Sequence, residues 1–574
     1  MRKFSYPDIL TVVSAVLIVL AFPPWGFAPL IWVALIPWLF ALSRARSLKA
    51  AWVQGIWLSF LMSVLGFHWV ASVLHEFGNI PWVFSILALL LFGLIGQPQF
   101  LAMGPGIWFL RERFPESTRH GWRGAFFLLG LTLFYAGVDW FLPKIFTDTL
   151  GHSLFSARHL RQAADLGGAH LLTTLIFASN YALFTLLERI RNRGEPSFWP
   201  ALNAALPQLG LVLLLCASAW SYGSVRLKVL EKALAKPLGY LQAGVIQGNI
   251  GDIEKIAAER GLHDAAESVI GTMLDLSDRA LAMSPRPDIL IWPETSYPST
   301  FRTPQTADEL GRDLQVERFV AERKIPLLFG GYDHDGRKDF NSFFVLTPPT
   351  ALPPALTKAS MTRGDENHIQ VYHKNMLLMF GEYIPGASYI RWLRETFPQV
   401  GNFGRGPGPS ILTVHPARGA GSSGSLPEVL ASPVICYEAL FPNYIIEAAR
   451  KGSQMILNIT NDSWFGPWGE PQLHLALVTF RSIESRLPQL RSTNTGISAL
   501  ILPDGEIVQT TAWGIPTVMN SKIPIIQPIP TLMIKWGDWF GWFAFCTGLT
   551  FLLFLSPWIQ NIRRYQRGTH RVSS

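Results

Sequence analysis

The chain has 574 residues, of which 49% are hydrophobic and 15% charged, and a formal net charge of +8. Soluble proteins carry roughly 25% charged residues, so this composition excludes a disordered chain, a fibrous protein and an ordinary cytosolic enzyme. The basic residues lie in short clusters between apolar runs, a pattern that sets the orientation of membrane-spanning helices. Because they do not gather on one soluble face, the sequence excludes nucleic acid as a partner.

Apolar runs dominate the first part of the chain and return near its end. They cover residues 9–22, 27–42, 51–74, 80–110, 122–142, 169–187, 205–222 and 539–559. A helix needs roughly 20 apolar residues to cross the hydrocarbon core, so the sequence predicts about eight spans. The first run is shorter and can instead form a shallow hairpin with the second. The fourth is interrupted by Gly93, Gly96, Pro98 and Pro105, which predicts a tilted or kinked helix.

Lysine and arginine mark alternate connections between these runs. They cluster at residues 2–3, 44–49, 111–123, 189–193 and 563–571. By the positive-inside rule, both termini are then cytoplasmic, and the chain crosses the membrane several times. The sequence predicts a transmembrane domain of seven helices at residues 1–222, a water-soluble domain outside the cytoplasm at residues 223–534, and a last helix with a basic cytoplasmic tail at residues 535–574.

Five polar side chains lie within or at the ends of the predicted spans: His68, Glu76, Gln97, Gln99 and Asp139. Ionisable groups at membrane depth are functional candidates by default. Near a helix end they can also simply reach interfacial water, and we favour that interpretation for Glu76 and Asp139.

Short β-like runs ending in polar residues characterise residues 223–534. They cover residues 244–247, 289–292, 327–330, 343–346, 434–436 and 455–458, with helical stretches at 252–283 and 473–486 and a hairpin that turns at Asp504-Gly505. Strand-like and helical segments that alternate in this way predict a layered α/β domain.

Cys436 is the only one of the three cysteines outside the predicted spans. It has no partner there for a disulfide, and no Cys/His set has zinc-site spacing, so no metal is predicted. A lone cysteine is more often a small buried hydrophobe than a nucleophile. However, Cys436 follows a β-like run directly, where catalytic groups of α/β domains commonly lie.

A thiol nucleophile needs a base and a group that stabilises developing negative charge. Glu294 follows an apolar strand-like run, Lys374 precedes the apolar segment 376–380, and Glu382 follows that segment. Taken singly, they indicate a structural cap, a solvated lysine and a loop carboxylate. The segment 376–380 itself can be ordinary core or part of a lid that dips into the lipid interface.

The order of these motifs resembles the nitrilase, or carbon-nitrogen hydrolase, superfamily. The matching segments are Trp292-Pro293-Glu294, His373-Lys374, Gly381-Glu382, Ile435-Cys436-Tyr437-Glu438 and Asn461-Asp462-Ser463-Trp464-Phe465-Gly466. The frame of about eight spans around this domain is similar to one branch, the bacterial apolipoprotein N-acyltransferases. Gln247-Gly248-Asn249-Ile250, residues 481–484, Arg491 and Asn494-Thr495-Gly496 match that branch too. The branch often has a tryptophan where this chain reads Glu254-Lys255-Ile256.

The resemblance implies an αββα sandwich and an acyltransferase that works through a thioester acyl-enzyme. It also implies a multi-pass protein of a bacterial inner membrane, in which residues 223–534 are a periplasmic catalytic domain. Glu294 would be the general base, Lys374 would stabilise the tetrahedral intermediate and Cys436 would be the nucleophile. Glu382, Tyr437, Glu438 and Trp464 would support the site or bind substrate. The donor would be a membrane phospholipid, typically phosphatidylethanolamine, the acceptor a diacylglyceryl-cysteine apolipoprotein, and no cofactor would be needed.

Two other functions are compatible with the sequence. A membrane-bound carbon-nitrogen or ester hydrolase would use the same Glu-Lys-Cys triad, with water in place of the amine. A lipid transporter or scaffold would have an external domain without catalysis. Transporters tend to show inverted repeats and paired broken helices, which the sequence lacks, and the complete triad argues against lost catalysis.

Overall fold

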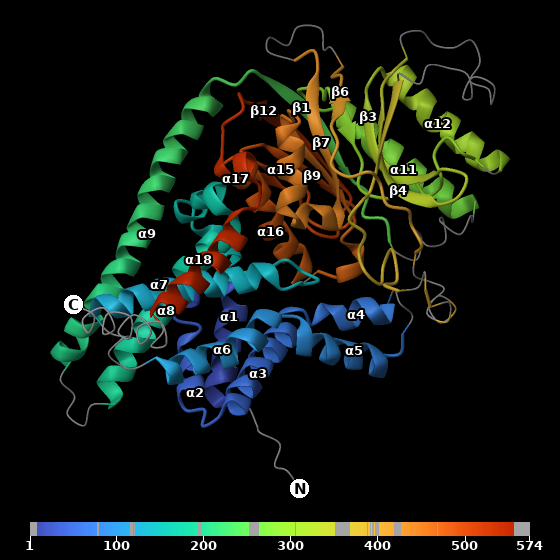
Figure 1. Ribbon diagram of the computed structural model, residues 1–574. Coiled ribbons are helices and arrows are strands. Elements are labelled where there is room, and N and C mark those ends of the chain that lie inside the picture. The colour runs from blue at the N-terminus through green and yellow to red at the C-terminus, as the bar shows by residue number, and fades with distance from the viewer. Residues whose placement is uncertain are drawn as a thin grey trace, which may run out of the picture. The chain divides into compact units, whose positions relative to one another are not determined.

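The computed structural model describes residues 8–76, 80–114, 119, 121–192, 198–251, 263–304, 306–349, 368–386, 389–390, 392, 395, 401–417, 426–467 and 469–555. These residues form two compact units. The helical unit lies within residues 1–75, 80–227 and 538–574, and the α/β unit within residues 76–79 and 228–537. Figure 1 shows the elements of both.

Among its described residues, the helical unit has five helices that are long and apolar enough to cross a membrane, namely Leu48–Gly66, Trp82–Arg113, Gly121–Phe141, Leu160–Arg191 and Phe198–Ala235. Three shorter apolar helices, Ile9–Ala21, Ala28–Ser43 and Phe540–Leu555, coincide with the remaining predicted runs. The individual elements are α1 (Ile9–Ala21), η1 (Ala28–Trp32), α2 (Ile36–Ser43), α3 (Leu48–Gly66), α4 (Trp69–Glu76), α5 (Trp82–Ile95), α6 (Pro98–Arg113), α7 (Gly121–Phe141), η3 (Leu150–Ser156), η4 (Leu160–Ala163), α8 (Ala164–Asn192), α9 (Phe198–Ala235) and α18 (Phe540–Leu555).

The predicted kink in the fourth run is confirmed. Helix α5 ends at Ile95 and α6 begins at Pro98, with Gln97 between them in a non-helical conformation (φ −127°, ψ 68°). Proline disfavours the helical conformation of the residue before it and is well suited to the first turn of a new helix. The break therefore follows from Pro98.

The expectation that the Asp139 side chain reaches interfacial water is wrong, because the protein itself encloses it. Its side chain is 2% exposed. One carboxylate oxygen lies 2.6 Å from Nζ of Lys144, which also donates to the carbonyl oxygen of Asp148. Gln97 donates to both carboxylate oxygens of Asp148, at 3.1 and 3.0 Å. A buried carboxylate is tolerated only when other groups compensate its charge, and Lys144 does so for Asp139 in place of interfacial water.

The α/β unit is built on two six-stranded sheets, with strand orders β12-β1-β2-β3-β4-β5 and β11-β10-β9-β8-β7-β6. The strands are β1 (Gly239–Gln247), β2 (Ile289–Ile291), β3 (Leu327–His334), β4 (Asp339–Leu346), β5 (Ile369–His373), β6 (Leu412–Val414), β7 (Val429–Ile435), β8 (Met455–Thr460), β9 (Gln489–Thr493), β10 (Ala499–Ile501), β11 (Ile507–Thr510) and β12 (Thr517–Ile525). Strands β1, β2 and β3 are parallel neighbours, and so are β7, β8 and β9.

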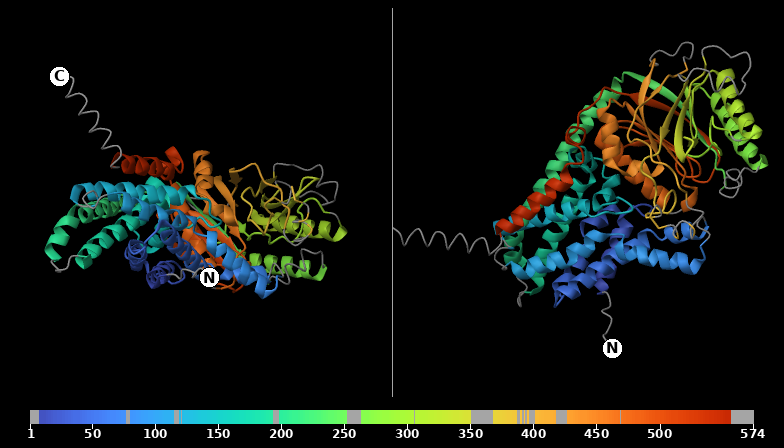
Figure 2. Two further views of the ribbon diagram at one scale, coloured as in Figure 1. Left: turned by 60° about the horizontal axis from the view of Figure 1, so that its bottom comes forward. Right: turned by 45° about the vertical axis from the view of Figure 1, so that its right-hand side comes forward.

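Apolar side chains from both sheets meet in one core. Leu241 and Val245 of β1 belong to the same buried cluster as Val429 of β7 and Leu457 of β8. A second core lies on the outer face of the first sheet, where Leu290 packs with residues of α11 (His263–Leu281) and α12 (Ala307–Arg323). The outer face of the second sheet carries α15 (Pro442–Arg450) and α16 (Glu470–Ser485), and Figure 2 shows this layering from two further sides. The predicted αββα sandwich is confirmed.

All six predicted strands and the hairpin are present. The hairpin joins β10 and β11, which pair antiparallel around Asp504-Gly505. The expected helix at 473–486 is α16, and the described part of the expected helix at 252–283 is α11. Strands β5, β6, β9 and β12 and helices α12 and α15 are additional to the predicted elements. Helix α17 (Leu532–Trp536) follows β12.

Candidate active site

The three predicted catalytic residues follow the ends of three strands. Glu294 lies just after β2, Lys374 directly after β5 and Cys436 directly after β7. The first two strands belong to one sheet and β7 to the other. Because the two sheets are packed face to face, the sandwich brings residues that are far apart in the sequence to one site.

Glu294 and Lys374 are joined in a buried network with Glu382. Nζ of Lys374 lies 3.1 Å from Oε1 of Glu294 and 2.9 Å from Oε1 of Glu382. The amide of Asn341 on β4 donates to the same two oxygens, at 2.8 Å each. The other oxygen of Glu294 accepts a hydrogen bond from the backbone N–H of Asn461 at 2.9 Å. One carboxylate oxygen of each acid is thus held by the same ammonium and amide.

The charge of Lys374 is secured by these carboxylates. The side chain is 2% exposed, and burial opposes its charged form. The charges of Glu294 and Glu382 outweigh that effect and raise the pKa of Lys374 well above its ordinary value. Lys374 is therefore a permanent ammonium group, which suits it to stabilise an oxyanion.

Cys436 occupies a sharp turn between β7 and η6 (Cys436–Leu440). Its φ is +50°, a left-handed conformation that residues with a side chain seldom adopt. The thiol is partly buried, and burial together with the negative charge of Glu294 raises its pKa well above the ordinary value, although Lys374 acts in the opposite direction. At rest Cys436 is therefore a thiol, close enough to Glu294 and Lys374 for both charges to act on it.

Glu438 stabilises this turn through hydrogen bonds to its backbone. The carboxylate is fully buried and accepts hydrogen bonds from the backbone N–H groups of Ile435, at 2.9 Å, and Asn375, at 2.7 Å. Tyr372 donates to it at 2.8 Å. Burial raises the pKa of Glu438 to about 6, against the hydrogen bonds that lower it. Glu438 thus links the segment carrying Lys374 to the turn carrying Cys436.

The remaining predicted residues lie around this centre. Tyr437 is buried with its ring edge-on to Phe441, and burial, with a smaller effect of Tyr383, raises its pKa to about 12. Trp464 lies in η7 (Ser463–Phe465) and is 39% exposed. The position of Ile256, where related chains often have tryptophan, lies outside the described residues.

For the segment 376–380 the sequence left two interpretations, ordinary core or part of a lid, and the two ends of the segment differ in their burial. Leu377 is buried, and Met376 packs against the core between the sheets. Phe380 is 59% exposed and has a φ of +62°. The first part of the segment is therefore core, and the last part projects an aromatic ring outward.

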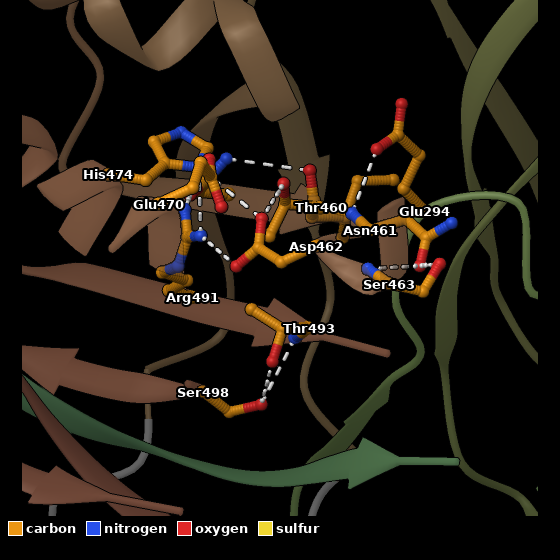
Figure 3. A network of polar contacts seen from close by, with 12 residues as sticks. Glu294, Thr460, Asn461, Asp462, Ser463, Glu470, His474, Arg491, Thr493 and Ser498 are labelled. Carbon is orange, nitrogen blue, oxygen red and sulfur yellow. Dashed lines mark hydrogen bonds and ion pairs between the residues drawn. The ribbon is translucent and has the colours of Figure 1, made fainter. Parts of the chain in front are cut away.

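A second buried polar network lies behind Cys436, on the side of α16. Asp462 lies between Arg491 of β9, at 2.7 Å, and the hydroxyl of Thr460, at 3.3 Å (Figure 3). His474 of α16 contacts Asp462 at 3.3 Å and Glu470 at 3.2 Å. Burial opposes ionisation of Asp462, but the positive charge of Arg491 prevails and lowers its pKa to about 2.

Asp462, Glu470 and His474 are also the one described group whose ligand atoms are close enough together, within 4.8 Å, for a metal ion. A cationic side chain already contacts these ligand atoms, because the nitrogen of Arg491 that donates to Asp462 also lies 3.2 Å from Nδ1 of His474. A guanidinium that already balances the acidic charge in this space disfavours a second cation there. The residues fit an internal ion-pair network better than a metal site.

Sequence reasoning did not assign a role to Asn341, Thr460 or Tyr372. Asn341 lies inside a strand, where nothing in the sequence distinguishes it from a solvent-facing residue. Thr460 ends a strand that was predicted, two residues before Asp462, so its position at a strand end was the available signal. The predicted motif residues at 247–250 and 494 do meet: the side chain of Asn494 accepts from the backbone N–H of Ile250 at 3.0 Å and donates to its carbonyl at 3.0 Å.

Comparisons with known proteins agree with this architecture. A family model described as the apolipoprotein N-acyltransferase N-terminal domain matches residues 14–182, and one described as carbon-nitrogen hydrolase matches residues 242–525. An apolipoprotein N-acyltransferase of Bdellovibrio bacteriovorus is 33% identical over 533 residues, covering 90% of this chain and 88% of that one. One of Geobacter metallireducens is 29% identical over 563 residues, covering 94% and 95%.

Among solved structures, the fold is similar to an amidase from Nesterenkonia sp. The sequence identity is 15%, the TM-score is 0.32, and the match covers 50% of this chain and 92% of that chain.

Proposed function

This chain belongs to the apolipoprotein N-acyltransferase family, and we propose that it transfers a fatty acyl chain from a membrane phospholipid to the α-amino group of a diacylglyceryl-cysteine apolipoprotein. It is an acyltransferase of lipoprotein maturation, and the proposed carrier of the acyl chain is a thioester on Cys436. The observation that supports this most is the shared site of Glu294 and Lys374, 3.1 Å apart, whose charges both act on the Cys436 thiol.

The first half-reaction forms the thioester. Glu294 removes the proton of the Cys436 thiol as the sulfur attacks the ester carbonyl of the donor. Lys374 stabilises the resulting oxyanion, because its ammonium is already fixed in a buried site and needs no reorganisation. The tetrahedral intermediate collapses with cleavage of the ester C–O bond, and the leaving lysophospholipid oxygen takes the proton from Glu294.

The second half-reaction releases the acyl chain as an amide. The neutral α-amino group attacks the thioester carbonyl and loses a proton to Glu294, and the departing Cys436 sulfur recovers that proton. An ester has been exchanged for the more stable amide, so the overall transfer is downhill and draws on no nucleotide. The contacts support two further roles: Glu382 holds Lys374, and Glu438 holds the backbone of the Cys436 turn. We assign substrate binding to Tyr437 and Trp464.

Radiolabelled phospholipid tests the acyl-enzyme. Purified full-length protein should acquire label that hydroxylamine removes, and Cys436→Ala should abolish labelling. Cys216→Ala and Cys546→Ala are matched controls, since both cysteines lie in the helical unit, and they should label normally. Label retained by Cys436→Ala would refute the thioester. Addition of a diacylglyceryl lipopeptide should move the label to the peptide, whereas release of free fatty acid alone would favour a hydrolase.

The proposed donor is phosphatidylethanolamine. Vesicles in which only this lipid carries the labelled chain should support transfer to the lipopeptide at a higher rate than vesicles in which only phosphatidylglycerol carries it. Equal rates would reject the head-group preference and leave the acyl transfer itself intact.

The proposed topology has about eight spans, a transmembrane domain at residues 1–222, a periplasmic catalytic domain at residues 223–534, and a last helix with a cytoplasmic tail at residues 535–574. The alternating basic clusters support it, and both termini are then cytoplasmic. In a chain freed of its own cysteines, a cysteine replacing exposed Arg323 should react with a membrane-impermeant maleimide in cells with an opened outer membrane. A cysteine replacing exposed Arg46 should not react until the inner membrane is opened.

A further inference from the structure

Thr460 lies next to the nucleophile although it is far from it in the sequence. Strands β7 and β8 are parallel, with Ile435 opposite Ile459, and the next residues along the two strands are Cys436 and Thr460. The Thr460 side chain is fully buried. Its hydroxyl lies 3.3 Å from Oδ1 of Asp462, and its influence on Cys436 lowers the pKa of that thiol, against the larger effect of burial. One hydroxyl group therefore has two possible acceptors.

Asp462 determines where the hydroxyl proton points while the enzyme is at rest. The carboxylate is ionised because it is paired with Arg491 at 2.7 Å, and an ionised carboxylate can only accept hydrogen bonds. A neutral thiol is a weak acceptor. The single proton of the Thr460 hydroxyl is thus drawn toward Asp462 as long as Cys436 keeps its own proton.

This preference reverses when the thiol loses its proton. A thiolate carries a full negative charge, and hydrogen bonds to ionised acceptors are roughly twice as strong as neutral ones. Asp462 can release the hydroxyl at little cost, because the contact is long and both Arg491 and His474 continue to hold the carboxylate (Figure 3).

The charges around the sulfur explain why such a donor is useful. Glu294 after β2 and Asp462 after β8 both disfavour the thiolate, and Lys374 after β5 favours it. Lys374 is itself shared between Glu294 and Glu382. A neutral hydroxyl stabilises the thiolate without adding a second cation, which would also attract the two carboxylates.

We propose that the Thr460 hydroxyl is a switched donor for the nucleophile, which donates to Asp462 while Cys436 is a thiol and to the sulfur once the thiol proton has passed to Glu294. The rotation transfers no proton of its own. The proposal rests on the proposed role of Cys436 as nucleophile, and it assigns to Thr460 a direct contact with a reacting atom.

The pH profile of Cys436 alkylation by iodoacetamide tests this without any lipid substrate. The full-length protein carrying Cys216→Ala and Cys546→Ala is the parent, so that Cys436 is the only thiol. Thr460→Val removes the hydroxyl and should raise the midpoint of the profile by about one to two pH units. Thr460→Ser keeps the hydroxyl and should restore the parent profile.

Thr493→Val is the matched control. Thr493 is opposite Thr460 in the pairing of β8 with β9, is equally buried, and bonds instead to Ser498 and Gln247. Its loss should leave the midpoint unchanged. Asp462→Asn should lower the midpoint, because it removes a negative charge near the sulfur. A general loosening of the fold would not give shifts of opposite sign at Thr460 and Asp462.

A midpoint that Thr460→Val leaves unchanged, or that Thr493→Val raises as much, would overturn the proposal. Should the valine variant fail to fold, Thr460→Ala carries the same expectation. Failure of the proposed function is separately visible, because acyl transfer would then persist in Cys436→Ala while the alkylation profiles remained interpretable.

Discussion

The hydroxyl of Tyr372 lies 2.8 Å from both carboxylate oxygens of Glu438, and the two side chains are buried together. Tyr372 is on β5, two residues before Lys374, and Glu438 is two residues after Cys436. Because β5 and β7 belong to different sheets, this contact holds the segment that carries Lys374 in place relative to the turn that carries Cys436.

Tyr372→Phe should therefore weaken both the fold and the site. Loss of a hydrogen bond to a charged group costs about 1.5–3 kcal/mol, and we expect a decrease of this size in the free energy of unfolding, with slower thioester formation. Denaturant unfolding and phospholipid labelling measure the two effects. Tyr240→Phe is the control, since Tyr240 is on β1 with its ring under Lys522. An equal effect of Tyr240→Phe would contradict the proposed coupling.

Glu438 should also give the stability a recognisable pH dependence. Its pKa in the folded protein is about 6, above the ordinary 4.5, so the folded state binds more protons between these values. The contribution of Glu438 to stability is therefore present below about pH 4.5 and is lost as the pH rises through 6. In Glu438→Gln this decrease in stability between pH 4.5 and pH 6 should disappear. The free energy of unfolding, measured at several pH values in that range, should then depend less on pH than in the parent protein. An unchanged pH dependence would assign the decrease to another group.

Glu294→Gln should lower the rate of thioester formation by about 10²- to 10⁴-fold, the usual contribution of a general base. The variant keeps the acceptor oxygen for Lys374 and Asn341 and loses the acceptor for the backbone N–H of Asn461, so the fold should be retained with a modest loss of stability. Single-turnover labelling of Cys436 measures the rate. If the base matters only for deprotonation, raising the pH should recover part of the lost rate, whereas a rate that does not respond to pH would point to a structural defect.

Asn341→Leu should impair the site although Asn341 takes no proton. The amide donates to both Glu294 and Glu382, and its removal leaves Lys374 as the one remaining partner of each of these two carboxylate oxygens among the described contacts. We expect a decrease in acyl transfer of about 10- to 100-fold, equivalent to the loss of one or two hydrogen bonds to charged groups. Asn520→Leu on β12, a half-buried asparagine bonded to Gln242 and Pro285, is the control. Full acyl-transfer activity of Asn341→Leu would show that Asn341 is not needed for the function of the site.

Arg491→Leu should be strongly destabilising, by about 3–5 kcal/mol, because it leaves Asp462 charged and buried without its main partner. Asp462 has a folded pKa of about 2, below the ordinary 3.8. The stability that this shift contributes is present above about pH 4 and is lost as the pH falls through 2. The defect of the variant should therefore be smaller at about pH 4, where Asp462 can become protonated at lower cost.

The exposed pair of Arg323 and Asp278 provides the comparison for this experiment, since its side chains are 43% and 46% exposed. Arg323→Leu should cause a much smaller change in stability, with no comparable dependence on pH. Thermal unfolding of the two variants in the same detergent at two pH values decides the matter. Similar effects of both substitutions would contradict a special role for the buried pair.

Strand-end motifs were readable from the sequence because apolar runs that end in a polar residue have a distinctive pattern. Glu294 and Cys436 were recognised in this way, whereas Lys374, Glu382 and Glu438 were assigned through the resemblance of the motif order to the nitrilase superfamily. Strand β9 was not recognised, since residues 489–493 contain only one strongly apolar side chain, Leu490, and its burial comes from neighbours on both sides. A polar strand buried by tertiary contacts carries no local signal.

The amino-acid sequence alone determined the membrane character, the layered α/β domain and the order of the acid, ammonium and thiol groups, because hydropathy and motif spacing are local properties of the chain. Only the tertiary structure decided that Asp139 is paired with Lys144, that Asn341 joins two carboxylates, and that Thr460, bonded to Asp462, ends the strand beside the one that Cys436 follows. These relationships depend on which strands become neighbours and which side chains lose their contact with water, and neither property is written in any single segment.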